Sequence, residues 1–196
     1  PVHSIRRQSE GIYAMLHFLA YEKENGRRHP EWEQKMKNML DILLQLQHAD
    51  GSFPRKFHDD FTVVDDSGGS TPSATLPLIM GYKYFKDKRY LASAKRTADY
   101  LEKVLISKAD YFSSTLDANC EDKEASLYAA TATYYLSLIT KGDEHRHYAD
   151  LTRKAAYFAL SWYYVWDVPF AQGQMLGDIG PVSYTHLRAH ETLRHL

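Results

Sequence analysis

The fold is constrained most by residues 43–57, LLQLQHADGSFPRKF. The stretch begins as the apolar end of a helix and changes at Asp50-Gly51 to a pair of residues typical of a tight turn. Phe53 follows the turn closely, where it can return to pack on the helix it has just left. The stretch therefore predicts a helix that ends near His48 and a chain that doubles back over it.

Apolar residues recur at helical spacing on both sides of this stretch, and no segment shows sustained strand alternation. The pattern predicts six helices, over residues 5–24, 30–48, 71–85, 89–106, 121–139 and 145–165. Pro30 lies at a favoured first-turn position, and Gly26 and Gly142 lie where helices are expected to end. We therefore predict an all-α fold.

These helices pair into three hairpins, with short turns at Gly26, Asp87 and Gly142 that are 61 and 55 residues apart. A repeat of this length is one two-helix unit, and stacked units bury a continuous core. The first helix of each pair is apolar around much of its circumference, whereas the second carries more charge. We expect the first helices to form an inner layer and the second helices an outer one.

Long connections join each hairpin to the next, at about residues 49–70 and 107–120, and a further one follows at 166–180. Because successive helices alternate in direction, all of them fall at one end of the molecule. Loops longer than about 12–15 residues are usually functional or disordered. These contain aromatic and acidic residues rather than linker composition, so we expect a functional surface at the long-loop end.

The pattern Q-x-x-D-G-S-F at residues 47–53 resembles one found in alpha/alpha toroids, which include terpenoid cyclases and many carbohydrate-active enzymes. Taken alone, the pattern is that of a structural turn. Together with hairpins of this period, it makes the chain similar to the six-hairpin glycosidase-like superfamily, whose complete barrel has six helical hairpins. The resemblance implies that residues 1–180 form about half of an (α/α)6 barrel.

The last residues of the chain, PVSYTHLRAHETLRHL at 181–196, resemble a translated sequencing adapter. We treat them as a non-native tail outside the barrel domain, as expected for a fragment from an environmental sequence. Adapter codons were never selected to fill a core, so we expect this tail to pack poorly on the hairpins.

The composition narrows the possible partners. The chain has 24 basic and 25 acidic residues, and a net charge of -1 gives no broad attraction to phosphate backbones or anionic lipid. Its apolar stretches are shorter than the ~20 residues of a membrane-spanning helix. Cys120 is the single cysteine, and the histidines are scattered, so no disulfide, metal or cofactor is expected. Compartment and oligomeric state stay open.

The resemblance implies a carbohydrate-active enzyme, in the first instance a bacterial glycoside hydrolase that uses carboxylate acid/base catalysis on an oligo- or polysaccharide. The cleft is expected at the long-loop end. The acidic residues of the long loops make the candidate catalytic groups Asp117, Asp122, Asp59 and Asp60. The candidate substrate-binding residues are Trp166, Asp167, Tyr111, Arg6 and Gln172. We expect the candidates in the long loops to converge on one concave surface.

Two alternatives stay open. A polysaccharide lyase of the same architecture would use a Tyr, His or Arg constellation, drawn here from Tyr111, His58 and Arg6. A helical-repeat binding module would instead present a groove without converging carboxylates. Because half a barrel holds only part of a catalytic site, we expect the fragment alone to be inactive.

Overall fold

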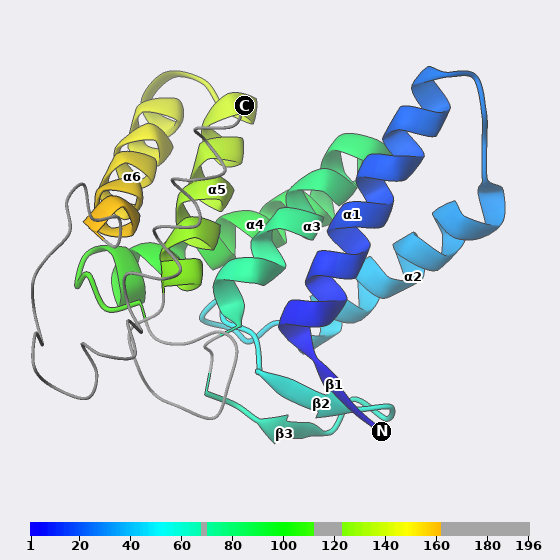
Figure 1. The fold of residues 1–196 in the computed structure, drawn as a ribbon, viewed down its shortest axis with the longest axis horizontal. Coiled ribbons are helices and arrows are strands. Elements are labelled where there is room, and N and C mark those ends of the chain that lie inside the picture. The colour runs from blue at the N-terminus through cyan, green and yellow to red at the C-terminus, as the bar shows by residue number, and fades with distance from the viewer. Residues whose placement is uncertain (68–69, 112–122, 162–196) are drawn as a thin grey trace, which may run out of the picture. The chain divides into compact units, whose positions relative to one another are not determined.

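The computed structural model describes residues 1–67, 70–111 and 123–161 (Figure 1). The helices are α1 (Ile5–Glu24), α2 (Pro30–Leu46), α3 (Thr71–Phe85), α4 (Lys88–Tyr100), η1 (Leu101–Ile106), α5 (Lys123–Ile139) and α6 (Gly142–Ser161). The strands are β1 (Val2–Ser4), β2 (Lys56–His58) and β3 (Val63–Asp65). The chain divides into two compact units, Pro1–Phe158 and Ala159–Leu196, and the packing below is that of the first.

The helix predictions are confirmed in number and order, with corrections at several ends. Helices α1 and α3 have the predicted bounds, whereas α2 stops at Leu46 and α6 already begins at Gly142. The predicted helix over 89–106 is α4 followed by η1, a π-helical segment. Apolar spacing does not distinguish a widened turn from an α-helical one, so the sequence did not show this change.

The division into inner and outer helices is also confirmed. Helix α3 packs against α1, α4 and α5, and 11 of its 15 residues are buried, compared with 8 of 19 across α4 and η1 (Figure 1). In α5, 7 of 17 residues are buried, whereas α6 buries few side chains and carries many charged ones. The apolar circumference of the first helices therefore marks the inner layer, as expected.

The predicted all-α class is confirmed, and a small antiparallel sheet that the sequence analysis did not predict, in the order β1-β2-β3, accompanies the helices. Val2 pairs with His58, and β2 returns to β3 through a turn in which Asp60 Oδ1 accepts the Thr62 N–H at 3.0 Å. Strands of three residues are too short to show an alternating pattern. Strands β2 and β3 lie within the first long loop, and pairing with β1 anchors that loop beside the start of α1 (Figure 1).

The Asp50-Gly51 stretch has the structural role predicted for it. The Ser52 N–H donates to Asp50 Oδ1 at 3.0 Å, and Gly51 takes a left-handed φ of 93°. Phe53 is fully buried, and its N–H donates to Thr71 Oγ1 at 2.9 Å. The turn thus fixes the path from α2 to the start of α3.

Gln47 connects this turn to the next hairpin. Its Nε2 lies 3.0 Å from the Ser93 carbonyl oxygen and 2.9 Å from Thr97 Oγ1, both on α4. The Ser93 hydroxyl donates back to Gln47 Oε1 at 2.7 Å. One amide therefore joins the outer helices α2 and α4 at the long-loop end.

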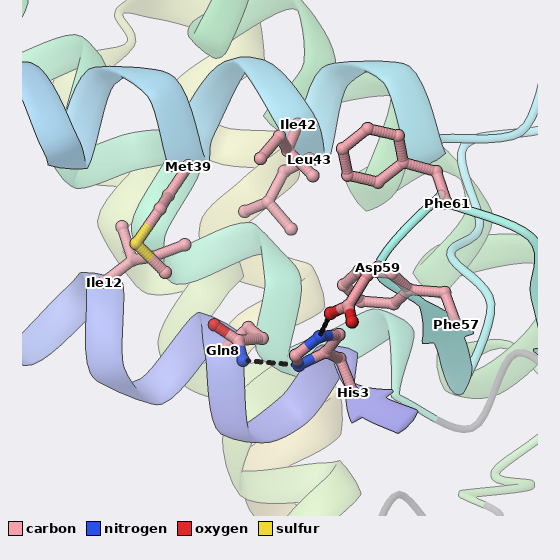
Figure 2. Close-up of a pocket in the computed structure, with 9 residues that line it drawn as sticks. All are labelled: His3, Gln8, Ile12, Met39, Ile42, Leu43, Phe57, Asp59 and Phe61. Atoms are coloured by element: carbon pink, nitrogen blue, oxygen red, sulfur yellow. Dashed lines mark hydrogen bonds and ion pairs between the residues drawn. The ribbon is translucent and has the colours of Figure 1, made fainter. Parts of the chain in front are cut away.

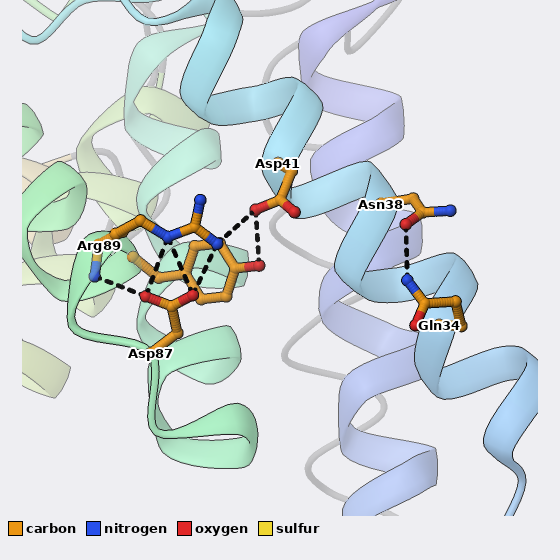
Figure 3. Close-up of polar contacts among 6 residues, drawn as sticks. Gln34, Asn38, Asp41, Asp87 and Arg89 are labelled. Carbon is orange, nitrogen blue, oxygen red and sulfur yellow. Dashed lines mark hydrogen bonds and ion pairs between the residues drawn. The ribbon is translucent and has the colours of Figure 1, made fainter.

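A second connection between α2 and α4 lies near the short turn at Asp87 (Figure 3). Asp87 Oδ1 accepts the Arg89 N–H at 2.9 Å and so caps α4. Asp41 of α2 accepts hydrogen bonds from Arg89 at 3.1 Å and from the Tyr90 hydroxyl at 2.9 Å. Together with the Gln47 contacts, they join α2 to α4 over successive helical turns.

Candidate functional site

Helices α1 and α5 both pack against α3, and polar and aromatic side chains of these two helices contact each other. We call this set the α1–α5 bridge, and its members are Arg6, Glu10, Tyr13, Glu124, Tyr128 and Tyr135. The members recur at spacings of four, three or seven residues along each helix, which places them on one face. The charged members of the bridge therefore lie near the starts of two inner helices, at the long-loop end, and the pair Tyr13–Tyr135 lies further along both helices.

Arg6 is at the centre of the bridge. Its Nε–H donates to Glu10 Oε1 at 2.9 Å, and its Nη2 pairs with Glu124 Oε2 at 2.7 Å. The Tyr128 hydroxyl also donates to Glu10. The carboxylates of Glu10 and Glu124 remain 43% and 45% exposed, so a solute can reach both.

The protonation states in the bridge follow from these contacts. Burial tends to raise the pKa of Glu10, but hydrogen bonds from Tyr128 and Arg6 outweigh it, and the pKa lies below its usual value. Burial and the hydrogen bond to Glu10 raise the pKa of Tyr128 to about 12. Burial and the 3.0 Å contact with the Tyr135 hydroxyl raise the pKa of Tyr13. At neutral pH the bridge thus offers an anionic acceptor together with protonated phenols.

A pocket lies on another side of α1 (Figure 2). Gln8 is two residues from both Arg6 and Glu10, so the helical rotation turns its side chain away from the bridge. Gln8 Nε2 donates to His3 Nδ1 at 3.4 Å, and His3 Nε2 lies 2.5 Å from Asp59 Oδ1. The His3 hydrogen bond is the main cause that holds the pKa of Asp59 below its usual range. Asp59 therefore remains anionic.

The structure separates the candidates predicted from the sequence. Arg6 belongs to the bridge, Asp59 lines the pocket, and Asp60 closes the turn between β2 and β3. Tyr111 is 1% exposed and packs on Phe158 with ring centroids 4.4 Å apart, a placement that gives no support for contact with a substrate. Asp117, Asp122, Trp166, Asp167 and Gln172 lie outside the described residues, as do Cys120 and residues 181–196.

The tyrosines of the bridge were not selected as candidates from the sequence. A signal was present, because each of these polar or aromatic residues interrupts an apolar inner helix at helical spacing. Periodicity alone does not show that the rows of polar and aromatic residues on two helices face each other, because this depends on how each helix is rotated about its axis.

Two further findings apply to the part of the chain that the structure describes. No group of three or more His, Cys, Asp or Glu side chains there is arranged to hold a metal ion. Among the same residues, no helix combines the length and the apolar character needed to cross a membrane.

No family model matches the sequence. The chain is similar to the solved structure of an unsaturated glucuronyl hydrolase from Bacillus sp. GL1, described as responsible for the degradation of glycosaminoglycan. The TM-score is 0.61 at 14% sequence identity, and the match covers 80% of this chain but 46% of that one, about half its length. At this identity the likeness concerns the fold. The paired helices are therefore half of an alpha/alpha toroid, with the fold of the six-hairpin glycosidases.

Proposed function

We propose that this chain is part of a glycoside hydrolase whose sugar cleft runs along the α1–α5 bridge at the long-loop end. The observation that carries the proposal is the bridge itself, a set of accessible carboxylates, a guanidinium and phenols on the inner helices of a glycosidase-type half toroid. Such groups supply both donors and acceptors for sugar hydroxyls, and tyrosine rings offer apolar faces to sugar C–H groups.

The acid and base of a glycosidase need different protonation states. Glu10 is suited to act as a carboxylate, because its hydrogen bonds from Tyr128 and Arg6 keep it ionised. The proton donor must then be another group, and we propose Asp122 or Asp117. Asp122 directly precedes α5, and two residues later Glu124 reaches Arg6. We further propose that Trp166, Asp167 and Gln172 contribute sugar contacts from the third long loop.

The protonation states of the described tyrosines favour hydrolysis over a lyase reaction in which a tyrosine is the base. A lyase needs a base that removes the proton beside a uronate carboxyl group, and a phenol performs this role best as a phenolate. Burial raises the pKa of Tyr13 and Tyr128, and Tyr111 is buried in the core. Asp59 and Asp60 lie away from the bridge and are not assigned a role in this cleft.

The similar protein's described role suggests oligosaccharides from glycosaminoglycans as the first substrates to test. The chain is incubated with saturated and with unsaturated glycosaminoglycan oligosaccharides, while the ultraviolet absorbance of the unsaturated uronate and the number of new reducing ends are followed. A hydrolase acting on the unsaturated end consumes the absorbance, and a lyase creates it. Heats of binding are measured in parallel, since half a toroid is able to bind a sugar that it does not cleave.

Variants then test the assignment of the site. In the complete enzyme that contains this chain, replacing Asp117 and Asp122 singly by Asn should lower turnover by at least ~100-fold for whichever is the proton donor. Glu10→Gln should weaken glycan binding, because it removes the charge on the acceptor at the centre of the bridge. Asp143→Asn at the opposite, short-turn end is the matched control and should change nothing. Absence of both cleavage and binding with every glycan tested, from a folded chain, would refute the proposal.

A further inference from the structure

The pocket between α1, α2 and the β2–β3 hairpin lies outside the proposed sugar cleft (Figure 2). We propose that it is a second binding site, for a small ligand with a protonated amino group and a compact apolar body. The inference rests on the walls of the pocket and on the charge at its polar edge, and it does not depend on the proposed hydrolase activity.

The size and the apolar lining of the pocket determine which ligand body can fit. The pocket has a volume of about 260 Å³, and its apolar lining consists of Ile12, Met39, Ile42, Leu43, Phe57 and Phe61. Small-molecule sites are typically ~300–1,000 Å³ and mostly apolar, with a few placed polar groups. At about 260 Å³ this pocket is slightly smaller than that range. It therefore suits a body of about one ring and is too small and too apolar for an oligosaccharide.

The polar side chains at the edge of the pocket, Gln8, His3 and Asp59, determine which head group of the ligand is favoured. Because Gln8 Nε2 donates to His3 Nδ1, the His3 ring proton that points to Asp59 is on Nε2. Asp59 is ionised and 61% exposed, so its second oxygen is available to a ligand. Figure 2 shows the amide nitrogen of Gln8 turned toward His3. The ionised carboxylate at this edge favours an ammonium donor and disfavours an anion.

The test compares three single-ring probes of equal size, benzylamine, benzyl alcohol and benzoate, by isothermal titration calorimetry at neutral pH. Benzylamine should bind at least ~10-fold more tightly than benzoate, as expected for a hydrogen bond to a charged group. Asp59→Asn should remove this preference. Asp60→Asn is the matched control, because Asn also accepts the Thr62 N–H of the turn and Asp60 does not line the pocket.

A variant that fills the pocket distinguishes binding inside it from a simple ion pair with Asp59 at the surface. Ile42→Trp fills the pocket and should lower the affinity for benzylamine while leaving Asp59 in place, and circular dichroism checks that the variant is folded. Equal affinities for benzylamine and benzoate, an unchanged affinity in folded Ile42→Trp, or the same loss in Asp60→Asn as in Asp59→Asn would each overturn the proposal.

Discussion

Replacement of Gly51 by alanine should cost more stability than any other glycine substitution in the described turns. Gly51 has a φ of 93°, and a Cβ atom added there would lie 2.1 Å from the Arg96 carbonyl oxygen and 2.6 Å from its carbon. The left-handed backbone costs a non-glycine residue roughly 1–2 kcal/mol. Overpacking adds about 1–3 kcal/mol, because helix backbone cannot rotate aside as a side chain does. The expected loss is therefore about 2–5 kcal/mol.

Gly26→Ala is the matched control, because Gly26 has a φ of 75° but its added Cβ would have nothing within 4 Å. It should show the backbone cost alone, about 1–2 kcal/mol. Urea unfolding followed by far-ultraviolet circular dichroism gives the free energy of unfolding of each variant. If Gly51→Ala and Gly26→Ala lose the same stability, the close approach of the turn to α4 is not the reason that position 51 requires glycine. The argument from packing is then refuted.

Three further predictions concern stability. Gly11→Ala should raise the free energy of unfolding by about 0.5–1 kcal/mol in the same urea assay, since Gly11 lies inside α1 and its added Cβ meets nothing within 4 Å; a loss would contradict this. Gln47→Ala should lower that free energy by about 1–3 kcal/mol, because the hydrogen bonds to α4 are lost, and an unchanged urea midpoint would show that they contribute nothing. Hydrogen bonds from Arg27 and His29 lower the pKa of Glu22 from 4.5 to about 2. The stabilising effect of ionised Glu22 is thus complete above pH 4.5 and is lost as the pH falls toward 2. In a plot of unfolding free energy against pH, Glu22→Gln should therefore lose less stability between pH 4.5 and 2 than the wild type. Parallel curves for the wild type and the variant would exclude this role.

Several parts of the fold were accessible from the sequence because they depend on local spacing. The bounds of α1 and α3, the order of the helices and the greater burial of α3 all follow from which residues recur every three to four positions. The turn at Asp50-Gly51 was equally accessible, since it depends on two adjacent residues with strong conformational preferences. The β1-β2-β3 sheet was missed because three-residue strands give no pattern above chance.

The candidate site was accessible only in part, because it depends on pairs that are distant in the sequence. Arg6 and Asp59 were both selected from their loops and helix starts, yet the structure places them on different sides of α1. The hydroxyl pair of Tyr13 and Tyr135 joins residues on two inner helices, and no local pattern indicates that these two side chains meet.

The sequence by itself determined that this chain is a series of helical hairpins with a long-loop end, because helical periodicity and turn chemistry act within a few residues. Tertiary structure alone decided which polar residues share a site. The rotation of α1 and α5 about their axes is set by packing against α3, and this packing brings Glu10 to Tyr128 and leaves Gln8 beside His3. The pocket likewise exists only because the sheet holds the loop after β2 over α1 and α2, so its charge and its apolar walls come from segments that the sequence keeps apart.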